Sequence, residues 1–181
     1  MSLHHRRLSL AQGASLCLFG ILFGLAFLSL APRAGSLVAS FLFLLVAWFC
    51  LWFFSHDLAH HVVGRIVGVG FRYYFLGRPA ITKLKLPVVS ELSRKVPVLG
   101  LKVDSSTLES VSATRVRAMY ASGAVFSMFL PLLVLPTSYM VNSIVGVLLT
   151  LLSLANILFT VYFSRRVGDL YRARMVRSVS L

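Results

Sequence analysis

The chain has 181 residues, of which 58% are hydrophobic and only 13% are charged, and its formal net charge is +13. A soluble domain of this size needs far more polar surface, so the composition excludes an ordinary soluble protein and favours a helical bundle solvated by lipid. The length fits a single membrane domain over 1–181, without a separate soluble domain.

The basic residues lie between or beside the apolar runs. In a soluble protein this charge would suggest nucleic acid as a partner. In a membrane protein, Lys and Arg collect on the cytoplasmic side, where they contact anionic lipid. We therefore expect anionic lipid as a partner and no nucleic acid.

The first apolar run covers about 13–31, which can cross a hydrocarbon core of about 30 Å as a helix. It also resembles a signal peptide, because a basic head precedes it and Ala-Pro-Arg-Ala ends it at 31–34. Pro32 and the length of the run favour an uncleaved anchor, whereas cleavage would leave the remaining topology unchanged. Gly20 and Gly24 either allow close helix contact or are ordinary small residues of a span.

The second apolar run starts at residue 37, and its helical pattern continues through a polar stretch to Gly68. We predict a span over 37–63 within a helix of about 30 residues, which projects from the bilayer or tilts within it. The region 70–114 then changes character. Alternating and β-branched residues predict strands at 71–75, 81–86 and 96–103, followed by the start of a helix at 105–112.

The third span is predicted over 119–136, followed by a short turn at 137–142 and a fourth span over 143–163. The predicted fold is therefore a membrane all-α bundle of about four transmembrane helices, with a small β-hairpin region between the second and third spans. If the N-terminus is cytoplasmic, seventeen of the eighteen Lys and Arg residues lie inside, and only Arg33 lies outside. This distribution predicts a multi-pass protein of the cell membrane with both termini in the cytoplasm.

One motif suggests chemistry at the inner end of the second span. His56 and His60 are four residues apart, so on a helix they share one face and are spaced to bind one metal ion. Asp57 takes the place of the carboxylate that activates water in the H-E-x-x-H motif. His61 points about 100° away and is a weaker candidate. A catalytic zinc needs a third protein ligand, and Asp169 is the natural candidate because it approaches the same border.

Other interpretations of these residues exist. His56 and His60 are also suited to face lipid headgroups, and Asp57 to pair with Arg65 or another Arg. Haem ligation by the two histidines fits less well, since a haem between helices usually takes ligands from facing helices, and the other spans contain no His.

The order of motifs resembles that of a known family. Residues 55–69 look like the first signature of the site-2 protease (peptidase M50) family, H-E-x-x-H followed by a small-residue helix and Gly-Val. Residues 71–86 are similar to the β-hairpin region that follows, and 120–127 resemble the Ala-Gly-Pro-x-x-Asn stretch of the next core span. Residues 154–156 and 168–170 resemble the last core span, which carries Asn and ends in Leu-Asp-Gly.

The resemblance covers roughly 36–175 and implies a zinc-dependent intramembrane protease whose substrate is a membrane-protein helix. It implies that His56, His60 and Asp169 bind Zn²⁺ and that Asp57 is the general base. Because Asp57 is one methylene shorter than the family's Glu, an alternative is an inactive member that binds membrane helices as an adaptor. An unrelated small membrane protein is a third possibility.

Overall fold

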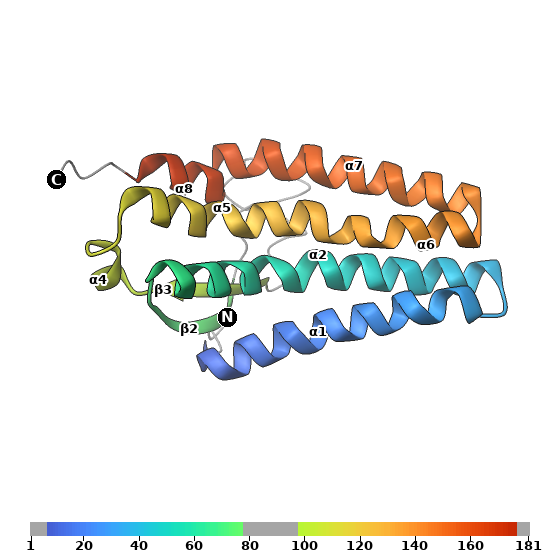
Figure 1. Ribbon diagram of the computed structural model, residues 1–181, viewed down its shortest axis with the longest axis horizontal. Coiled ribbons are helices and arrows are strands. Elements are labelled where there is room, and N and C mark those ends of the chain that lie inside the picture. The colour runs from blue at the N-terminus through green and yellow to red at the C-terminus, as the bar shows by residue number, and fades with distance from the viewer. Residues whose placement is uncertain (1–6, 78–97, 177–181) are drawn as a thin grey trace, which may run out of the picture.

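The computed structural model describes residues 7–77 and 98–176. Within them, long helices run side by side along the molecule and a small sheet lies at one end (Figure 1). In chain order, the elements are β1 (Arg7–Leu8), α1 (Leu10–Leu30), η1 (Ala31–Arg33), α2 (Leu37–Val67), β2 (Phe71–Gly77), β3 (Val98–Val103), α4 (Ser105–Leu108), α5 (Ala113–Phe129), η3 (Leu130–Leu133), α6 (Val134–Val141), α7 (Ser143–Arg166) and α8 (Asp169–Met175).

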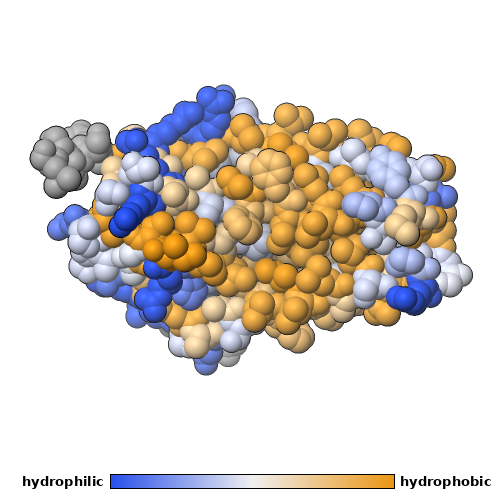
Figure 2. All heavy atoms as spheres, in the orientation of Figure 1, coloured by the Kyte–Doolittle hydropathy of each residue, from blue (hydrophilic) through white to orange (hydrophobic). Residues whose placement is uncertain are grey.

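Four helical stretches are long and apolar enough to cross a membrane: Leu10–Arg33, Leu37–Val67, Ala113–Val141 and Ser143–Met175. Hydrophobic residues cover the middle of the molecule, while hydrophilic residues gather towards its ends (Figure 2). The predicted membrane all-α bundle with a small sheet is therefore confirmed, and the structure is consistent with a multi-pass membrane protein.

The sheet, α4 and α8 lie at one end of the bundle (Figure 1). The connections from α1 to α2 and from α6 to α7 lie at the opposite end. Residues far apart in the sequence, in the second, third and fourth long helices, therefore meet beside the sheet.

The helix ends follow local signals in the sequence. The side chain of Ser9 caps α1 by accepting a hydrogen bond from the backbone N–H of Gln12, and Ser36 does the same for α2 through Ala39. Gly68 ends α2 with φ of +93°, in the left-handed region that favours glycine. The predicted continuation of this helix through the histidine motif to Gly68 is thus confirmed.

The predicted turn at 137–142 is wrong, because α6 continues to Val141. Pro131 and Pro136 lie in the first turns of η3 and α6, where a backbone N–H has no partner within the helix and its loss costs little. The break comes at Asn142, whose side chain caps the next helix by accepting from the N–H of Ile144.

Helices α1 and α2 approach closely through small residues on α1. A Cβ on Gly20 would lie 2.2 Å from the ring of Phe54, and a Cβ on Gly24 would lie 2.8 Å from Cβ of Cys50. Both glycines are buried. The Gly20–Gly24 pair therefore serves close helix contact, one of the two interpretations left open by the sequence.

The sheet has the order β1-β2-β3 and is antiparallel throughout. The predicted strands at 71–75 and 96–103 correspond to β2 and β3, while the one predicted at 81–86 lies outside the described residues. Strand β1 was not predicted, since two residues of a basic head give no alternating pattern. Its Leu8 pairs with Tyr74 of β2.

Tyr74 attaches the sheet to the bundle. Its side chain is fully buried, its ring lies against Gly13 of α1, and its hydroxyl lies 3.0 Å from Nδ1 of His61 on α2. Burial raises the pKa of Tyr74, so the hydroxyl keeps its proton at neutral pH and shares a hydrogen bond with His61. The contact holds β2 beside the part of α2 that carries the histidine motif.

Candidate metal centre

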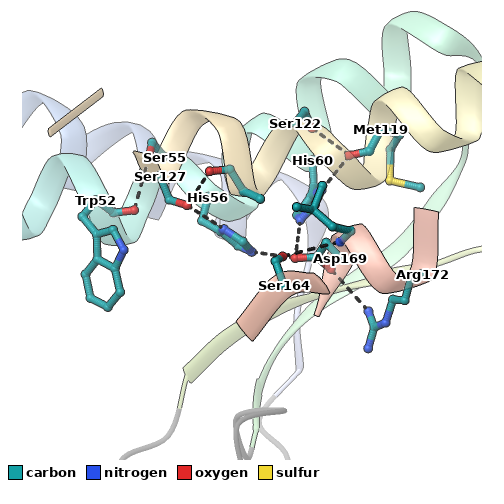
Figure 3. A network of polar contacts seen from close by, with 12 residues as sticks. Trp52, Ser55, His56, His60, Met119, Ser122, Ser127, Ser164, Asp169 and Arg172 are labelled. Atoms are coloured by element: carbon teal, nitrogen blue, oxygen red, sulfur yellow. Dashed lines mark hydrogen bonds and ion pairs between the residues drawn. The ribbon is translucent and has the colours of Figure 1, made fainter. Parts of the chain in front are cut away.

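Helix α2 presents His56 and His60 on one face, towards the start of α8 (Figure 3). Both imidazoles point at one carboxylate oxygen. Oδ2 of Asp169 lies 3.2 Å from Nε2 of His56 and 3.3 Å from Nε2 of His60. The three residues singled out in the sequence as candidate ligands are thus brought together, and their ligand atoms all lie within 4.8 Å of one another.

Helix α5 sets the proton positions on both rings. Nδ1 of His60 lies 2.8 Å from the carbonyl oxygen of Met119, which can only accept, so this nitrogen carries hydrogen. The hydroxyl of Ser127 donates to the carbonyl of Ala124 at 3.1 Å and is therefore left to accept from Nδ1 of His56, at 3.4 Å. In the neutral form of each ring, Nε2 then presents a lone pair.

Two imidazole lone pairs and a carboxylate oxygen facing one another repel unless a cation lies among them or both rings take up a second proton. In a tetrahedral zinc site with bonds of about 2.0–2.1 Å, neighbouring ligand atoms are about 3.3 Å apart. The two distances from Asp169 match this spacing, and all three ligand atoms lie within 4.8 Å of one another. The donor set of two imidazoles and one carboxylate also suits Zn²⁺, so the residues fit the predicted ion.

Close backbone packing holds the donors in place. A Cβ on Gly123 of α5 would lie 2.2 Å from Nε2 of His60, so this position has no room for a side chain. Gly168 packs against Ser164, where a Cβ would lie 2.7 Å from the Cα of that serine. The hydroxyl of Ser164 also accepts a hydrogen bond from the N–H of Leu170. These contacts fix the turn that aims Asp169 at the histidines.

Asp57 lines the same cavity as the three donors and is 8% exposed. Within 7–77 and 98–176, its carboxylate makes no hydrogen bond or ion pair, so the alternative pairing with Arg65 is not formed. His61 lies on another face of α2 and contacts Tyr74, as the 100° offset predicted. Asp57 is therefore near the donor cluster with its oxygen lone pairs free.

The cavity beside the donors has a volume of about 540 Å³. Its walls are mainly apolar and come from α2, α5, α7 and the two longer strands. The large apolar side chains among them are Trp52, Phe53, Phe71, Phe75, Leu99, Leu101, Phe159 and Phe163. An extended polypeptide segment with apolar side chains suits such walls.

Several residues of the site, besides Ser164 and Gly168, received no role from the sequence. Met119 and Ser127 orient the rings, Gly123 makes space for His60, and Arg172 lies 3.8 Å from the second oxygen of Asp169. A backbone carbonyl carries no signal in sequence. The small residues at 121–124 are a signal from which a close approach of another group to α5 could have been predicted.

Comparisons with models of protein families, with curated proteins and with solved structures found no match to this chain. The geometry of the chain's own residues therefore carries the functional argument.

Proposed function

We propose that the chain is a site-2-protease-like intramembrane zinc metalloprotease, which hydrolyses peptide bonds of membrane-protein substrates. The observation that supports this proposal is the convergence of three donor atoms, from His56, His60 and Asp169, beside a cavity in an apolar four-helix bundle. Ionisable groups inside a membrane bundle are energetically costly and usually have a function.

The chain's residues hold and orient the centre. The three residues that bind the ion are His56, His60 and Asp169. The carbonyl of Met119 and the hydroxyl of Ser127 accept hydrogen bonds from the Nδ1–H groups and so keep both rings in the metal-binding tautomer. Zinc bound there supplies a Lewis acid that polarises a peptide carbonyl and lowers the pKa of water.

Asp57 acts as the general base. It directly follows a ligand, lines the cavity and makes no hydrogen bond or ion pair with described residues, so its lone pairs are available to a water molecule. The carboxylate takes a proton from the attacking water and returns it to the leaving amine. The distribution of basic residues supports a cell-membrane protein with cytoplasmic termini, which contacts anionic lipid and admits water from the cytoplasmic end.

Elemental analysis of protein purified in detergent, with cleavage of a model membrane substrate, tests the proposal. We expect one zinc per chain in the wild type and in Asp57→Asn, and none in His60→Ala. His61→Ala is the matched control, because this neighbouring histidine faces away from the donors and its loss leaves the metal bound. Only the metal-loaded proteins that retain Asp57 cleave the substrate. If wild-type protein purified at neutral pH contains no stoichiometric metal, the proposal is wrong.

The second candidate is a catalytically inactive adaptor that binds membrane helices. The shorter side chain of Asp57 favours it, because a displacement of about 1 Å can cost on the order of a hundredfold in rate. Zinc binding without cleavage, together with helix binding that is unchanged in Asp57→Ala, would establish this alternative. Cleavage that rises in Asp57→Glu would instead argue for a protease.

A further inference from the structure

Arg172 lies at the edge of the cavity and is one of its lining residues. Of the described residues that line it, only Arg172 is a lysine or arginine. Arg172 is three residues after Asp169 on α8, so both side chains lie on the same side of that helix (Figure 3). The turn that aims Asp169 at the histidines therefore also aims Arg172 at the cavity.

The donors of Arg172 are largely unused. Nη1 lies 3.8 Å from Oδ1 of Asp169, beyond hydrogen-bond distance, whereas the histidines face the other oxygen, Oδ2. The backbone N–H of Arg172 bonds to the carbonyl of Gly168, but no hydrogen bond holds its guanidinium within the described parts of the chain, and the side chain is 55% exposed. A guanidinium has five N–H donors in a planar fork that matches a carboxylate.

The surroundings favour an acidic ligand. Further exposed arginines belong to elements that meet at this end of the bundle (Figure 1): Arg117 to the start of α5, Arg165 and Arg166 to the end of α7, and Arg174 to α8. The summed field of such a basic end attracts acidic segments and repels basic ones. The apolar cavity walls meanwhile suit an apolar segment.

We propose that Arg172 determines specificity by binding a carboxylate of the substrate polypeptide, next to the apolar segment that fills the cavity. This inference rests on the proposed function, because it names the substrate feature that the same site selects. The carboxylate comes from an acidic side chain or from a chain end. Both offer the two oxygens that the guanidinium fork binds.

Fluorescence anisotropy with synthetic peptides in detergent tests the inference without requiring cleavage. The peptides carry one apolar run followed by Asp with an amidated end, by Asn with an amidated end, or by Asn with a free end. We expect wild-type protein to bind an Asp or free-end peptide about tenfold or more tighter than the amidated Asn peptide. If the protein prefers only the Asp peptide, the carboxylate is that of an acidic side chain; if it prefers only the free-end peptide, the carboxylate is that of a chain end.

Arg172→Gln should lose this preference, and Arg172→Lys should keep part of it. Arg174→Gln is the matched control, because this residue lies on the same short helix but does not line the cavity, and it should keep the preference. The metal content of Arg172→Gln should equal that of the wild type, since a residue that merely positioned Asp169 would alter it.

An equal affinity of wild type for Asp and amidated Asn peptides overturns the inference, as does a preference that survives in Arg172→Gln. A variant Arg172→Gln that loses metal together with peptide binding also overturns it, because the role is then structural. The inference is also overturned if Arg172→Gln changes only the binding of anionic vesicles and leaves peptide binding as in the wild type. Failure of the proposed function is distinct, since it appears as missing zinc or missing cleavage in the wild type.

Discussion

Replacement of Gly123 by Ala tests the geometry of the centre most directly. The new Cβ would lie 2.2 Å from Nε2, 2.6 Å from Cε1 and 2.7 Å from Cδ2 of His60. Ordinary contacts of a Cβ begin at 3.4 Å, so the ring must move by about 1.2 Å, or α2 and α5 must separate. Either movement shifts a metal-binding nitrogen away from the other donors.

The cost follows from two contacts. Overpacking of a close-packed site costs about 1–3 kcal/mol. Loss of the 2.8 Å hydrogen bond from His60 to the carbonyl of Met119 adds about 0.5–1.5 kcal/mol. We expect the free energy of unfolding to fall by about 1.5–4.5 kcal/mol. Because the ring is displaced and loses its orienting partner, zinc affinity should fall at least about tenfold.

Zinc titration against a competing chelator and thermal unfolding in detergent measure the two effects. Gly24→Ala is the matched control, because its Cβ would lie 2.8 Å from Cβ of Cys50, in a tight α1–α2 contact that none of the donor residues shares. It should lower the unfolding temperature but leave zinc affinity unchanged. If Gly123→Ala binds zinc as the wild type does while His60→Ala does not bind it, the reasoning about this contact is refuted.

Tyr74→Phe should lower the free energy of unfolding by about 1 kcal/mol, because it removes the hydroxyl bonded to His61; thermal unfolding that matches the wild type would contradict this. Hydrogen bonds from Arg72 and from Ser106 hold the pKa of Asp104 below its ordinary value. The ionised carboxylate therefore stabilises the fold above the unfolded pKa of about 3.9, and this contribution is lost as the pH falls through the folded pKa. Asp104 also caps α4, because its side chain accepts a hydrogen bond from the backbone N–H of Ser106. Asp104→Asn keeps this capping oxygen but removes the charge, so its unfolding temperature should lie below that of the wild type at pH 7 and approach it at about pH 2. A gap that does not depend on pH would show that the charge has no such role.

The bundle could be predicted because long apolar runs identify membrane helices in a sequence. The start of α2 at residue 37 and its continuation to Gly68 follow from such a pattern. The end of the third long helix could not be predicted, because prolines usually end helices. Pro131 and Pro136 instead lie in the first turns of η3 and α6, where proline is tolerated. Strand β1 could not be predicted, because Arg7–Leu8 has no periodicity of its own. It is a strand only through its pairing with β2.

At the site, the spacing of His56 and His60 placed two imidazoles on one face, and the shared border of the spans pointed to Asp169. The structure brings all three together, whereas binding of zinc stays a prediction. The contacts that orient the donors were beyond the sequence, since the carbonyl of Met119 and the missing side chain of Gly123 matter only through tertiary packing.

The donors come from helices that are synthesised in turn. His56 and His60 lie on the second long helix, their orienting partners lie on the third, and Asp169 follows α7 of the fourth. Because chains are made from the N-terminus, the three donor atoms can meet only after α7 has been inserted and α8 has packed against α5. A chain in which α7 and α8 are not yet in place therefore offers the two imidazoles without the carboxylate of Asp169, so assembly of the donor cluster is tied to insertion of α7.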